Sequence, residues 1–504
     1  MKKGMVALVG AGPGEVSLLT VRAKELIEAA EVVLYDRLVS ADILALIPSA
    51  AQKINVGKEN NNHPVPQHEI NARLLQAAQG GNLVVRLKGG DPYVFGRGGE
   101  ELELLVANNI PFEVVPGITS AIAAPSFAGV PVTHRDFCSS FHVITGHQKK
   151  NEPLNIDFES LVRTKGTLIF LMGVSSLVAI TEGLLQAGMA GDMPAAMVEQ
   201  GTRANQRKVV ATLSTLQQAA QAAEIKSPAI IIVGKVCSLS AEFDWFTARP
   251  LYGKEVVVTS PANSGNRLAS MLKAQTAMVH SMPAVAIEPC MGQGALAEII
   301  AQLAGYTWLV FTSKNGVELF FAALAAQGKD ARCLAHLQIA AVGPSTAQSL
   351  QAHGIVADYT PAVYAGQSLA EGLLEKLSPA QDTLLLLRAQ GADDALPRAL
   401  TEASIAYTDK ALYGTQPLTC LEYKTTLAAL AQRTAAAGGM WYTCFTSAST
   451  VHAFMKNNPD TTRMCGICIG KQTAAAAQEY HLNYHVAQQA TLQSMVDTLL
   501  EVAQ

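Results

Sequence analysis

Short, almost wholly apolar runs recur along the chain and alternate with Ala-rich segments whose apolar positions follow a helical period. The runs include "EVVLYD", "NLVVRLKGGD", "TLIFLMG", "AIIIVG", "EVVVTS", "WLVFTS" and "TLLLLR". A strand that is apolar at every position is buried on both faces, as happens when helices cover both faces of a sheet. The pattern therefore predicts an α/β protein with mainly parallel sheets.

The pattern changes near residues 246–252, where we expect one unit to end. "AIIIVGKVCSL" is typical of a last strand, "EFDWFTARPLYGK" of a connector, and "EVVVTS" of a new first strand. The sequence therefore predicts a domain over 1–245, a linker over 246–252 and a second unit over 253–504.

The second unit contains an internal repeat. "WLVFTSKNGVELF" (308–320) is similar to "MWYTCFTSASTVHAF" (440–454), and "IAAVGPSTAQSLQAHG" (339–354) is similar to "GICIGKQTAAAAQEY" (466–480). Each segment has the pattern of a strand, a polar turn and a helix, and the two pairs follow in the same order. The repeat predicts two similar lobes, about 253–285 with 415–504 and about 286–414.

Composition and charge narrow the class of protein. The 504 residues are 49% hydrophobic and 15% charged, with a formal net charge of −4. No basic excess points to nucleic acid, and no apolar run reaches the ~18 residues of a membrane span. The eight scattered cysteines fit a reducing cytoplasm. "CGIC" (465–468) is expected to be a pair of buried strand residues rather than a metal or redox site, and we expect no metal centre.

The first glycine-rich turn, in "VALVGAGPGEVSLLT" (6–20), leaves two interpretations open. Gly10 and Gly12 fit a dinucleotide-binding fingerprint, and Asp36 ends the next strand where a ribose-binding acid would lie. However, Glu15 stands at the third glycine position, where its charge would face a pyrophosphate at a helix N-terminus. A nicotinamide-dependent oxidoreductase is therefore the weaker interpretation.

The strongest local signal is "VVRLKGGDPYVFGRGGEELELL" (84–105). A strand ends in Arg86 and Lys88 and runs into two glycine-rich turns, between which Asp91 offers a hydrogen-bond acceptor. Adjacent glycines let a backbone approach a ligand closely. "VPGITSA" (115–121) has the same architecture, with Thr119 and Ser120 where a helix begins, either as caps or as ligand contacts at the carboxyl ends of strands.

Together these stretches resemble the tetrapyrrole methylases, and within them the uroporphyrinogen-III C-methyltransferases. The resemblance spans about 1–245 and is carried by "VGAGPGEVSLLT", "VVLYDRLVS", "RLKGGDPYVFGRGGEE", "VPGITSA", "GVPVTHRD", "FLMG" and "EQGT". It implies the two-lobed α/β methylase fold, distinct from the dinucleotide-binding fold, and S-adenosyl-L-methionine as the methyl donor, with S-adenosyl-L-homocysteine as its product. The donor contacts it implies are Pro13, Gly89, Gly90, Asp91, Val94, Thr119, Ser120, Met172, Gly201 and Ala229.

The same resemblance assigns roles to charged residues. Asp36 becomes a proton acceptor, and Lys58 a proton donor. An electron-rich pyrrole carbon attacks the methyl group, and a carboxylate near the macrocycle stabilises the positive charge and moves a proton. We expect Arg37, Arg97 and Arg135 to pair with substrate carboxylates, unless they are only surface charge.

The second unit resembles uroporphyrinogen-III synthase, a family with two α/β lobes around an open cleft. "FTSKNGV", "VGPSTA", "LLLLRAQGADDALPRAL", "LYGT", "FTSAST" and "IGKQTA" carry this resemblance. One departure is Thr259-Ser260 at the end of the first strand, where the family usually has Thr-Arg.

Helix N-termini and hydroxyl groups bind carboxylates without a cofactor, although each hydroxyl could serve only as a cap. Tyr413 is the candidate for assisting hydroxyl departure. The expected substrate-binding residues of this unit are Thr312, Ser313, Asn315, Thr346, Arg388, Ser447 and Thr473.

These observations predict a bifunctional cytoplasmic enzyme of sirohaem and corrinoid biosynthesis. The C-terminal half would close hydroxymethylbilane to uroporphyrinogen III, and the N-terminal half would methylate it twice to precorrin-2. The expected partners are small tetrapyrroles, not nucleic acid or membrane, and the resemblance implies a homodimer through the methyltransferase half. The alternatives are a methyltransferase with a non-catalytic tetrapyrrole-binding module, and a different methyl acceptor.

Overall fold

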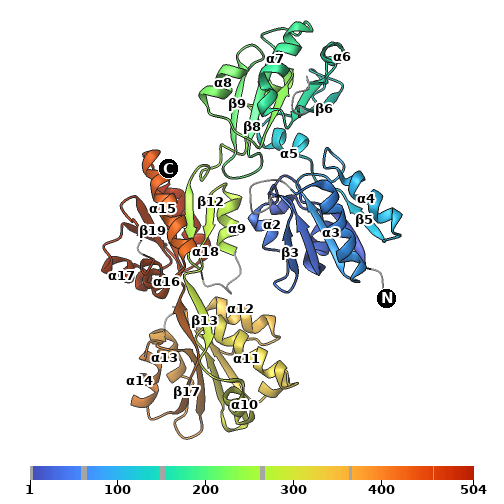
Figure 1. Cartoon of the computed structure of the whole chain (residues 1–504). Helices are drawn as coiled ribbons and strands as arrows, with labels where there is room; N and C mark the ends of the chain where they lie inside the picture. The colour runs from blue at the N-terminus through green and yellow to red at the C-terminus, as the bar shows by residue number, and fades with distance from the viewer. Residues whose placement is uncertain are drawn as a thin grey trace. The chain divides into compact units, whose positions relative to one another are not determined.

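The computed structural model describes residues 4–57, 65–147, 154–260, 267–362, 366–457 and 459–503. It divides into two compact units (Figure 1). Unit 1 comprises 1–253 with 273–278, and unit 2 comprises 254–272 with 279–504. Among the described residues, no helix has both the length and the apolar character that a membrane span requires.

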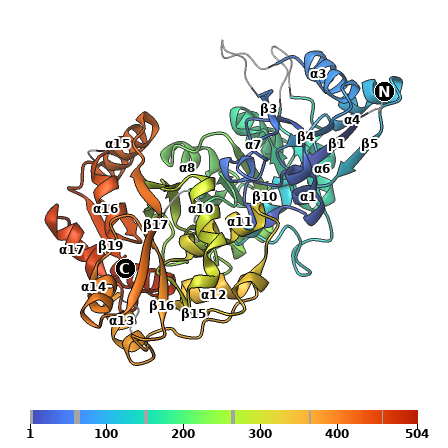
Figure 2. The same cartoon turned by 90° about the horizontal axis from the view of Figure 1, so that it is seen from below.

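The first sheet of unit 1 has the order β3-β2-β4-β1-β5, and its paired strands are all parallel. Helices α3 and α4 pack on one face through Leu74 and Leu105, and helices α1 and α2 pack on the other through Ile27 and Ile43. Figure 2 shows α3 and α1 on opposite faces of this sheet. The elements are β1 (Met5–Gly10), α1 (Val21–Ala29), β2 (Val32–Tyr35), α2 (Ala41–Leu44), β3 (Gln52–Asn55), α3 (Gln67–Gln79), β4 (Leu83–Lys88), α4 (Gly98–Ala107) and β5 (Phe112–Val115).

The second sheet of unit 1 has the order β6-β7-β10-β8-β9 and is the exception among the mainly parallel sheets that the sequence predicts. Only β6 and β7 are parallel, whereas β10 runs antiparallel to β7 and to β8, and β8 antiparallel to β9. The elements are α5 (Ser120–Phe127), β6 (Phe141–Thr145), α6 (Phe158–Thr164), β7 (Thr167–Leu171), α7 (Leu177–Gln186), β8 (Pro194–Glu199), β9 (Arg207–Thr212), α8 (Leu216–Ala222) and β10 (Ala229–Val233).

Helices bury both faces of this second sheet. Ile169 and Ile230 face α5, whereas Phe170 and Ile231 face α7 and α8. Burial on both faces requires apolar residues at every position, whatever the direction of the strands. The apolar runs "TLIFL" and "AIIIV" therefore report two covered faces and not a parallel sheet.

Residues 246–252 pack against unit 1. Phe246 is buried and its ring lies tilted against that of Phe127, with 4.9 Å between centroids. Leu251 is fully buried, and the Tyr252 hydroxyl donates a hydrogen bond to the Gln206 carbonyl. The guanidinium of Arg249 lies 4.8 Å above the Trp245 ring. The predicted linker is thus held by an aromatic cluster along most of its length.

Unit 2 contains two further sheets. One has the order β12-β11-β18-β19-β20, and β11, β18, β19 and β20 pair in parallel. Its elements are β11 (Glu255–Val258), α9 (Arg267–Ala274), β12 (Met278–Ser281), α15 (Leu421–Ala436), β18 (Trp441–Phe445), α16 (Ala448–Met455), β19 (Met464–Cys468), α17 (Lys471–Glu479), β20 (Tyr484–Val486) and α18 (Leu492–Val502). Cys465 and Cys468 are buried in β19, as predicted.

The other sheet has the order β13-β17-β16-β14-β15 and is parallel apart from β13. Its elements are β13 (Val285–Pro289), α10 (Gln293–Ala301), β14 (Trp308–Phe311), α11 (Lys314–Ala326), β15 (Gln338–Ala341), α12 (Pro344–Ala352), α13 (Gly366–Leu374), β16 (Thr383–Ala389), α14 (Ala395–Glu402) and β17 (Ala406–Pro417). The repeated segments fold alike, because β14 pairs in parallel with β15 as β18 does with β19, and each is followed by a helix.

Candidate functional site

The carboxyl ends of the parallel strands in the first sheet bring the predicted residues of unit 1 together. β1, β2, β4 and β5 end at one edge, at Gly10, Tyr35, Lys88 and Val115. The segments that follow these strands carry most of the residues expected at the site. This edge is where α/β proteins place their ligands.

Four glycine backbones touch at this edge. Gly90 N–H donates to the Gly12 carbonyl at 2.8 Å, and Gly12 N–H donates to the Gly90 carbonyl at 3.1 Å. A Cβ on Gly117 would overlap the Gly90 carbonyl oxygen and lie 2.7 Å from the Gly10 Cα. The contact therefore requires glycine, and it leaves a cradle of bare backbone at the strand ends.

Asp91 ties two of these turns together. Its Oδ1 accepts hydrogen bonds from the Tyr93 and Val94 N–H groups at 2.8 and 3.2 Å, and its Oδ2 accepts one from Gly117 N–H at 3.1 Å. The acceptor role predicted from the sequence is thus taken up by backbone. A further contact of Asp91 or Val94 with a ligand stays a prediction, as it does for Pro13 and Gly89 in the same turns.

Three more of the predicted donor contacts lie at one edge of the second sheet. Met172 follows β7 with a φ of +57° and is half exposed, and Gly201 follows β8. Because β10 is antiparallel to both strands, Ala229 at its start lies at the same edge, paired with Glu199. Thr119 accepts a hydrogen bond from Ala121 N–H as the N-cap of α5, and Ser120 begins that helix.

Gly201 lies against α5 so closely that no side chain fits. A Cβ on Gly201 would overlap that of Ala124 and lie 3.0 Å from its Cα. The glycine is therefore required by the packing of the loop after β8 on α5, in addition to any ligand contact.

Arg203 was not predicted from the sequence, and it joins the two lobes of unit 1. Its Nη2 donates a hydrogen bond to the Leu38 carbonyl at 2.9 Å, and a Cβ on Gly14 would lie 2.7 Å from its Nε. Burial lowers the pKa of the Arg203 guanidinium. With Arg37 it lines a hollow of about 260 Å³. The sequence feature that relates to Arg203 is Gly14, because the missing side chain of this glycine makes room for an arginine nearly two hundred positions away.

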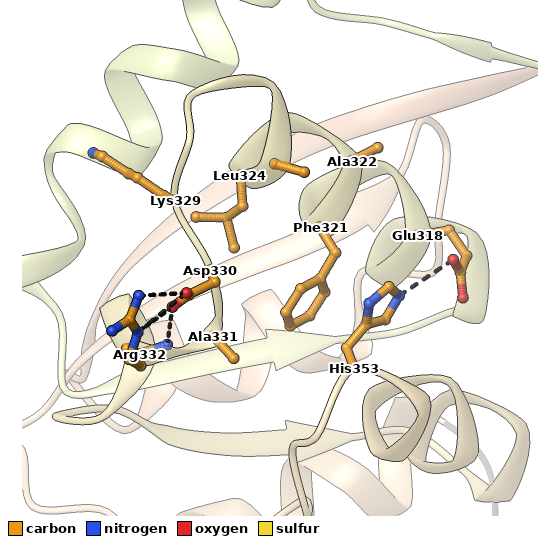
Figure 3. A pocket seen from close by; sticks show the side chains of 10 residues that line it. Glu318, Phe321, Ala322, Leu324, Lys329, Asp330, Ala331, Arg332 and His353 are labelled. Atoms are coloured by element: carbon orange, nitrogen blue, oxygen red, sulfur yellow. Dashed lines mark hydrogen bonds and ion pairs between the residues drawn. The ribbon is translucent and has the colours of Figure 1, made fainter.

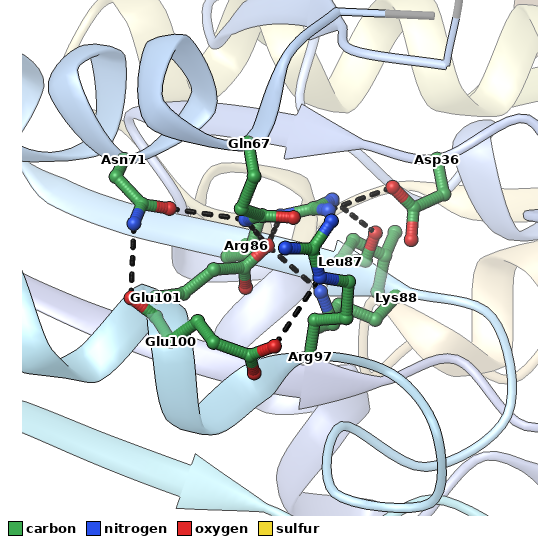
Figure 4. A network of polar contacts seen from close by, with 9 residues as sticks. All are labelled: Asp36, Gln67, Asn71, Arg86, Leu87, Lys88, Arg97, Glu100 and Glu101. Atoms are coloured by element: carbon green, nitrogen blue, oxygen red, sulfur yellow. Dashed lines mark hydrogen bonds and ion pairs between the residues drawn. The ribbon is translucent and has the colours of Figure 1, made fainter. Parts of the chain in front are cut away.

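A network of charges lies behind Asp36 (Figure 4). Arg86 Nη2 lies 2.7 Å from Asp36 Oδ1, and Arg86 Nε lies 3.0 Å from Glu101 Oε1. Lys88 Nζ lies 2.8 Å from the same Glu101 oxygen. Arg86, Lys88 and Glu101 are buried, whereas the Asp36 side chain is 31% exposed.

Burial sets the electrostatics of this network. Loss of hydration and the neighbouring Arg86 charge lower the pKa of Lys88, against the opposing attraction of Glu101. Gln67, on α3, donates to Glu101 Oε1 at 3.2 Å and so joins the network from a third element. The signal for this cluster was two cations within an otherwise apolar strand.

The remaining cations of the site are at the surface. Arg37 and Arg135 are exposed and form no ion pair with the described residues, and Arg97 pairs with Glu100 at 3.3 Å. Lys58 lies outside the described residues. Within the described ranges, no group of three His, Cys, Asp or Glu side chains is arranged to hold a metal ion.

In unit 2, the fold brings together two predicted residues that are 100 positions apart in the sequence, Tyr413 and Ser313. The Tyr413 hydroxyl, on the 5%-exposed side chain, donates to Ser313 Oγ at 2.7 Å. The register of β16 and β17 shifts after Arg388, so that Leu412 is an extra residue in β17. Such a bulge re-aims the side chain beside it, which here is Tyr413.

The four helix-start hydroxyls of unit 2 fall into two kinds. Ser313 and Ser447 are N-caps of α11 and α16 and accept hydrogen bonds from backbone N–H groups. Thr346 and Thr473 are buried in the first turns of α12 and α17, whose N-caps are glycines. Thr312 and Asn315 lie half-buried beside Ser313. Their roles toward a substrate stay predictions.

Arg388 is engaged within unit 2. Its Nε donates to Asp409 Oδ1 at 2.9 Å and its Nη1 donates to the Asp393 carbonyl at 2.7 Å. The hydrogen bond that Arg388 donates to Asp409 raises the pKa of the guanidinium further, against the effect of burial. A substrate carboxylate would therefore have to compete with Asp409 for this arginine.

A larger hollow, of about 590 Å³, lies on α11 (Figure 3). His353 stacks on Phe321 with 4.2 Å between ring centroids and points its Nε2 to Glu318 at 3.3 Å. Arg332 pairs with Asp330 at the other end. No predicted site residue lines this hollow.

Comparisons with known proteins match both units. The family model for tetrapyrrole (corrin/porphyrin) methylases matches residues 5–217, and the model for uroporphyrinogen-III synthase HemD matches residues 266–497.

Individual relatives agree with these family matches. The porphyrin biosynthesis protein HemD of Ruminiclostridium josui is 47% identical over 504 residues, covering 100% of this chain and 99% of its own. The S-adenosyl-L-methionine-dependent uroporphyrinogen III methyltransferase of Methanosarcina barkeri is 52% identical over 237 residues, 47% of this chain and 93% of its own. The solved uroporphyrin-III C-methyl transferase of Thermus thermophilus, complexed with S-adenyl homocysteine, is 41% identical over 47% of this chain and 99% of its own, with a TM-score of 0.41.

Proposed function

Because this chain belongs to the tetrapyrrole methylases through its N-terminal part and to the uroporphyrinogen-III synthases through its C-terminal part, we propose that it is a bifunctional enzyme of tetrapyrrole biosynthesis. Its C-terminal half closes hydroxymethylbilane to uroporphyrinogen III. Its N-terminal half transfers two methyl groups to that product and forms precorrin-2. The two predicted domains, 1–245 and 253–504, carry one activity each.

The observation that carries the methyl-transfer activity is the cradle of Gly10, Gly90 and Gly117 beside Asp36. Glycine at these positions lets the turns after β1, β4 and β5 meet backbone to backbone at the strand ends, and uncharged backbone there suits a cationic donor. When bound, S-adenosylmethionine supplies the methyl group and leaves as S-adenosylhomocysteine. The residues proposed to contact it come from the edges of the two sheets: Pro13, Gly89, Gly90, Asp91, Val94, Thr119, Ser120, Met172, Gly201 and Ala229.

The residues around the cradle orient the reactants and move the proton. The new carbon–methyl bond leaves a positive charge on the macrocycle, which the Asp36 carboxylate stabilises until a ring proton departs to it. Lys58 is the proposed proton donor of the site, and Arg37, Arg97 and Arg135 bind substrate carboxylates. Holding both reactants in line supplies much of the acceleration.

The synthase activity centres on the Tyr413–Ser313 pair. The substrate must lose a hydroxyl group before its ring closes, and a phenol can donate the proton that makes hydroxide a better leaving group. In the folded chain the Tyr413 hydroxyl donates to Ser313, which shows that its proton faces the start of α11. Thr312, Asn315 and Ser447 hold the carboxylates at helix N-termini.

A Tyr413→Phe variant isolates this contribution. Removing the hydroxyl should slow the formation of uroporphyrinogen III by about 10²-fold, the usual worth of one positioned acid. Tyr407→Phe is the matched control, because its hydroxyl also pairs with a hydroxyl, that of Thr401 at 3.0 Å in the same lobe. Equal rates for the two variants would exclude Tyr413 from the reaction.

A second candidate function is favoured by Arg388 and Ser260. Arg388 is occupied by Asp409, and Ser260 stands where the synthase family usually has an arginine. If both contacts with substrate carboxylates are weakened in this way, the C-terminal half would bind a tetrapyrrole without converting it, and only the methyltransferase would be active.

The isomer of the product separates the two candidates. The whole protein is given fresh hydroxymethylbilane without S-adenosylmethionine, and the oxidised uroporphyrins are separated by chromatography. A predominance of the type III isomer is expected. Only the type I isomer, which forms spontaneously, together with active methylation of added uroporphyrinogen III, would leave the methyltransferase alone.

We also propose that the protein is a homodimer through its methyltransferase half and works in the cytoplasm. Large apolar side chains of the second sheet and its helices, including Val178, Leu185 and Val210, are exposed, as at an interface. All eight cysteines are free thiols, which fits a reducing compartment. Sedimentation of the purified protein tests the dimer.

A further inference from the structure

The buried end of β4 carries more positive charge than its surroundings balance. Arg86 and Lys88 are two residues apart, so both side chains leave the same face of the strand. They are 2% and 3% exposed, and both contact a single oxygen, Oε1 of Glu101. Buried charge is costly unless it is paired, so a second carboxylate is needed.

Asp36 is the carboxylate that balances this cluster. It follows β2, the neighbour of β4 in the sheet, and accepts a hydrogen bond from Arg86 Nη2 at 2.7 Å. With it, two cations face two carboxylates. The Asp36 side chain is still 31% exposed, so that it remains accessible at the carboxyl ends of the strands.

Arg86 is itself held on several sides. Its Nε donates to Glu101, and its Nη1 donates to the Leu87 carbonyl at 3.3 Å. Glu101 is completely buried and its Oε2 has no hydrogen-bond partner among the described residues, so its charge is directed to the two cations. The Arg86 guanidinium therefore has little conformational freedom, and the Asp36 carboxylate that is bound to it is restrained as well (Figure 4).

We propose that Arg86 is a positioning residue of methyl transfer, which fixes the Asp36 carboxylate at the glycine cradle, and that Glu101, which also pairs with Lys88, holds Arg86 in place. The inference rests on the proposed function, in which Asp36 acts on the macrocycle. Because a displacement of about 1 Å can cost about 10²-fold in rate, a fixed carboxylate is worth far more than a mobile one.

The test uses Arg86→Gln in the full chain. This change leaves Lys88 and Glu101 as a neutral buried pair and Asp36 in contact with solvent, so no unpaired charge stays buried. Arg22→Gln is the matched control, because Arg22 makes a similar two-bond pair with Glu113, at 2.8 Å for each bond, on the exposed surface.

The measurements are kcat and KM for methylation of uroporphyrinogen III, the Kd for S-adenosylmethionine by calorimetry, and the melting temperature. We expect Arg86→Gln to lower kcat by about 10- to 100-fold, with the Kd for the donor within about twofold of the wild type. Arg86→Lys should recover part of the loss. The double variant Asp36→Asn/Arg86→Gln should be no slower than Asp36→Asn, because Arg86 acts through Asp36.

Other outcomes overturn the inference. If the losses in kcat from Arg86→Gln and Asp36→Asn multiply in the double variant, Arg86 has a merely structural role. The same conclusion follows if Arg22→Gln lowers kcat as much as Arg86→Gln does. A wild-type protein that binds the donor but does not methylate uroporphyrinogen III would refute the proposed function, and the positioning role with it. If the wild type methylates uroporphyrinogen III but the effects of the two variants on kcat are independent, only the positioning role is refuted.

Discussion

At the residue scale, burial controls the chemistry of four thiols. Loss of hydration raises the pKa of Cys237, Cys444 and Cys468 to about 12 and that of Cys465 to about 11, from an ordinary value of 9.0. Cys290 and Cys420 are exposed. The buried thiols therefore keep their protons in the folded protein under conditions in which the unfolded chain has lost them.

The alkaline stability of the protein follows from this difference. Above pH 9 the folded state binds more protons than the unfolded state, so the free energy of unfolding falls as the pH rises toward 12. Each such thiol contributes a slope of about 1.4 kcal/mol per pH unit. Urea unfolding between pH 7 and 10.5 should show a shallower fall for Cys444→Ala than for the wild type. Cys290→Ala is the control and should keep the wild-type slope.

Residue types were easier to predict than residue partners. The sequence predicted Asp91 as a hydrogen-bond acceptor and Arg388 as a substrate-binding residue. In the folded chain Asp91 accepts from Gly117 N–H and Arg388 donates to Asp409, while their contacts with a ligand stay predictions. Asp36 and Arg86 are 50 positions apart and meet because β2 and β4 pair. Nothing local in the sequence encodes that pairing, so the charge balance at Asp36 emerged only from the fold.

At the scale of elements, the apolar runs predicted strands well and strand direction less well. The parallel sheets of unit 2 and the first sheet of unit 1 were expected from the pattern, whereas the second sheet is mostly antiparallel. Its reversal has a consequence for the site, because only an antiparallel β10 brings the start of a strand, Ala229, to the edge where β7 and β8 end.

The glycine contact between the turns after β1, β4 and β5 yields a sharper test. Gly117→Ala should weaken S-adenosylmethionine binding at least about tenfold, or about 1.4 kcal/mol, because its Cβ would push against the backbone of Gly90 and Gly10. Gly191→Ala is the control, since its Cβ would meet nothing closer than 3.5 Å. Titration calorimetry measures both, and equal affinities would show that the turns separate freely.

At the scale of the whole molecule, the two units have separate cores. The buried clusters found among the described residues lie wholly in unit 1, around Leu34, Val33, Ile230 and Phe170, or wholly in unit 2, around Phe311, Leu386 and Trp441. A unit with its own core can melt without the other.

Calorimetry of the intact chain should therefore resolve two transitions. S-adenosylhomocysteine at 100 times its Kd should stabilise unit 1 by about 2.7 kcal/mol and leave unit 2 unchanged. One transition should move to higher temperature and the other should stay. A single transition that moves as a whole would mean that the units unfold together.

The packing of residues 246–252 decides at which residue the chain can be cut so that its two halves can be expressed separately. A methyltransferase expressed alone and ended at residue 245 would lack Phe246, Leu251 and Tyr252, and would expose Phe127 and the Gln206 carbonyl that they cover. Such a fragment should aggregate. A stop codon placed after Gly253 keeps this aromatic cluster with the methyltransferase. A synthase fragment that begins at Lys254 would carry residues 273–278, which also belong to unit 1.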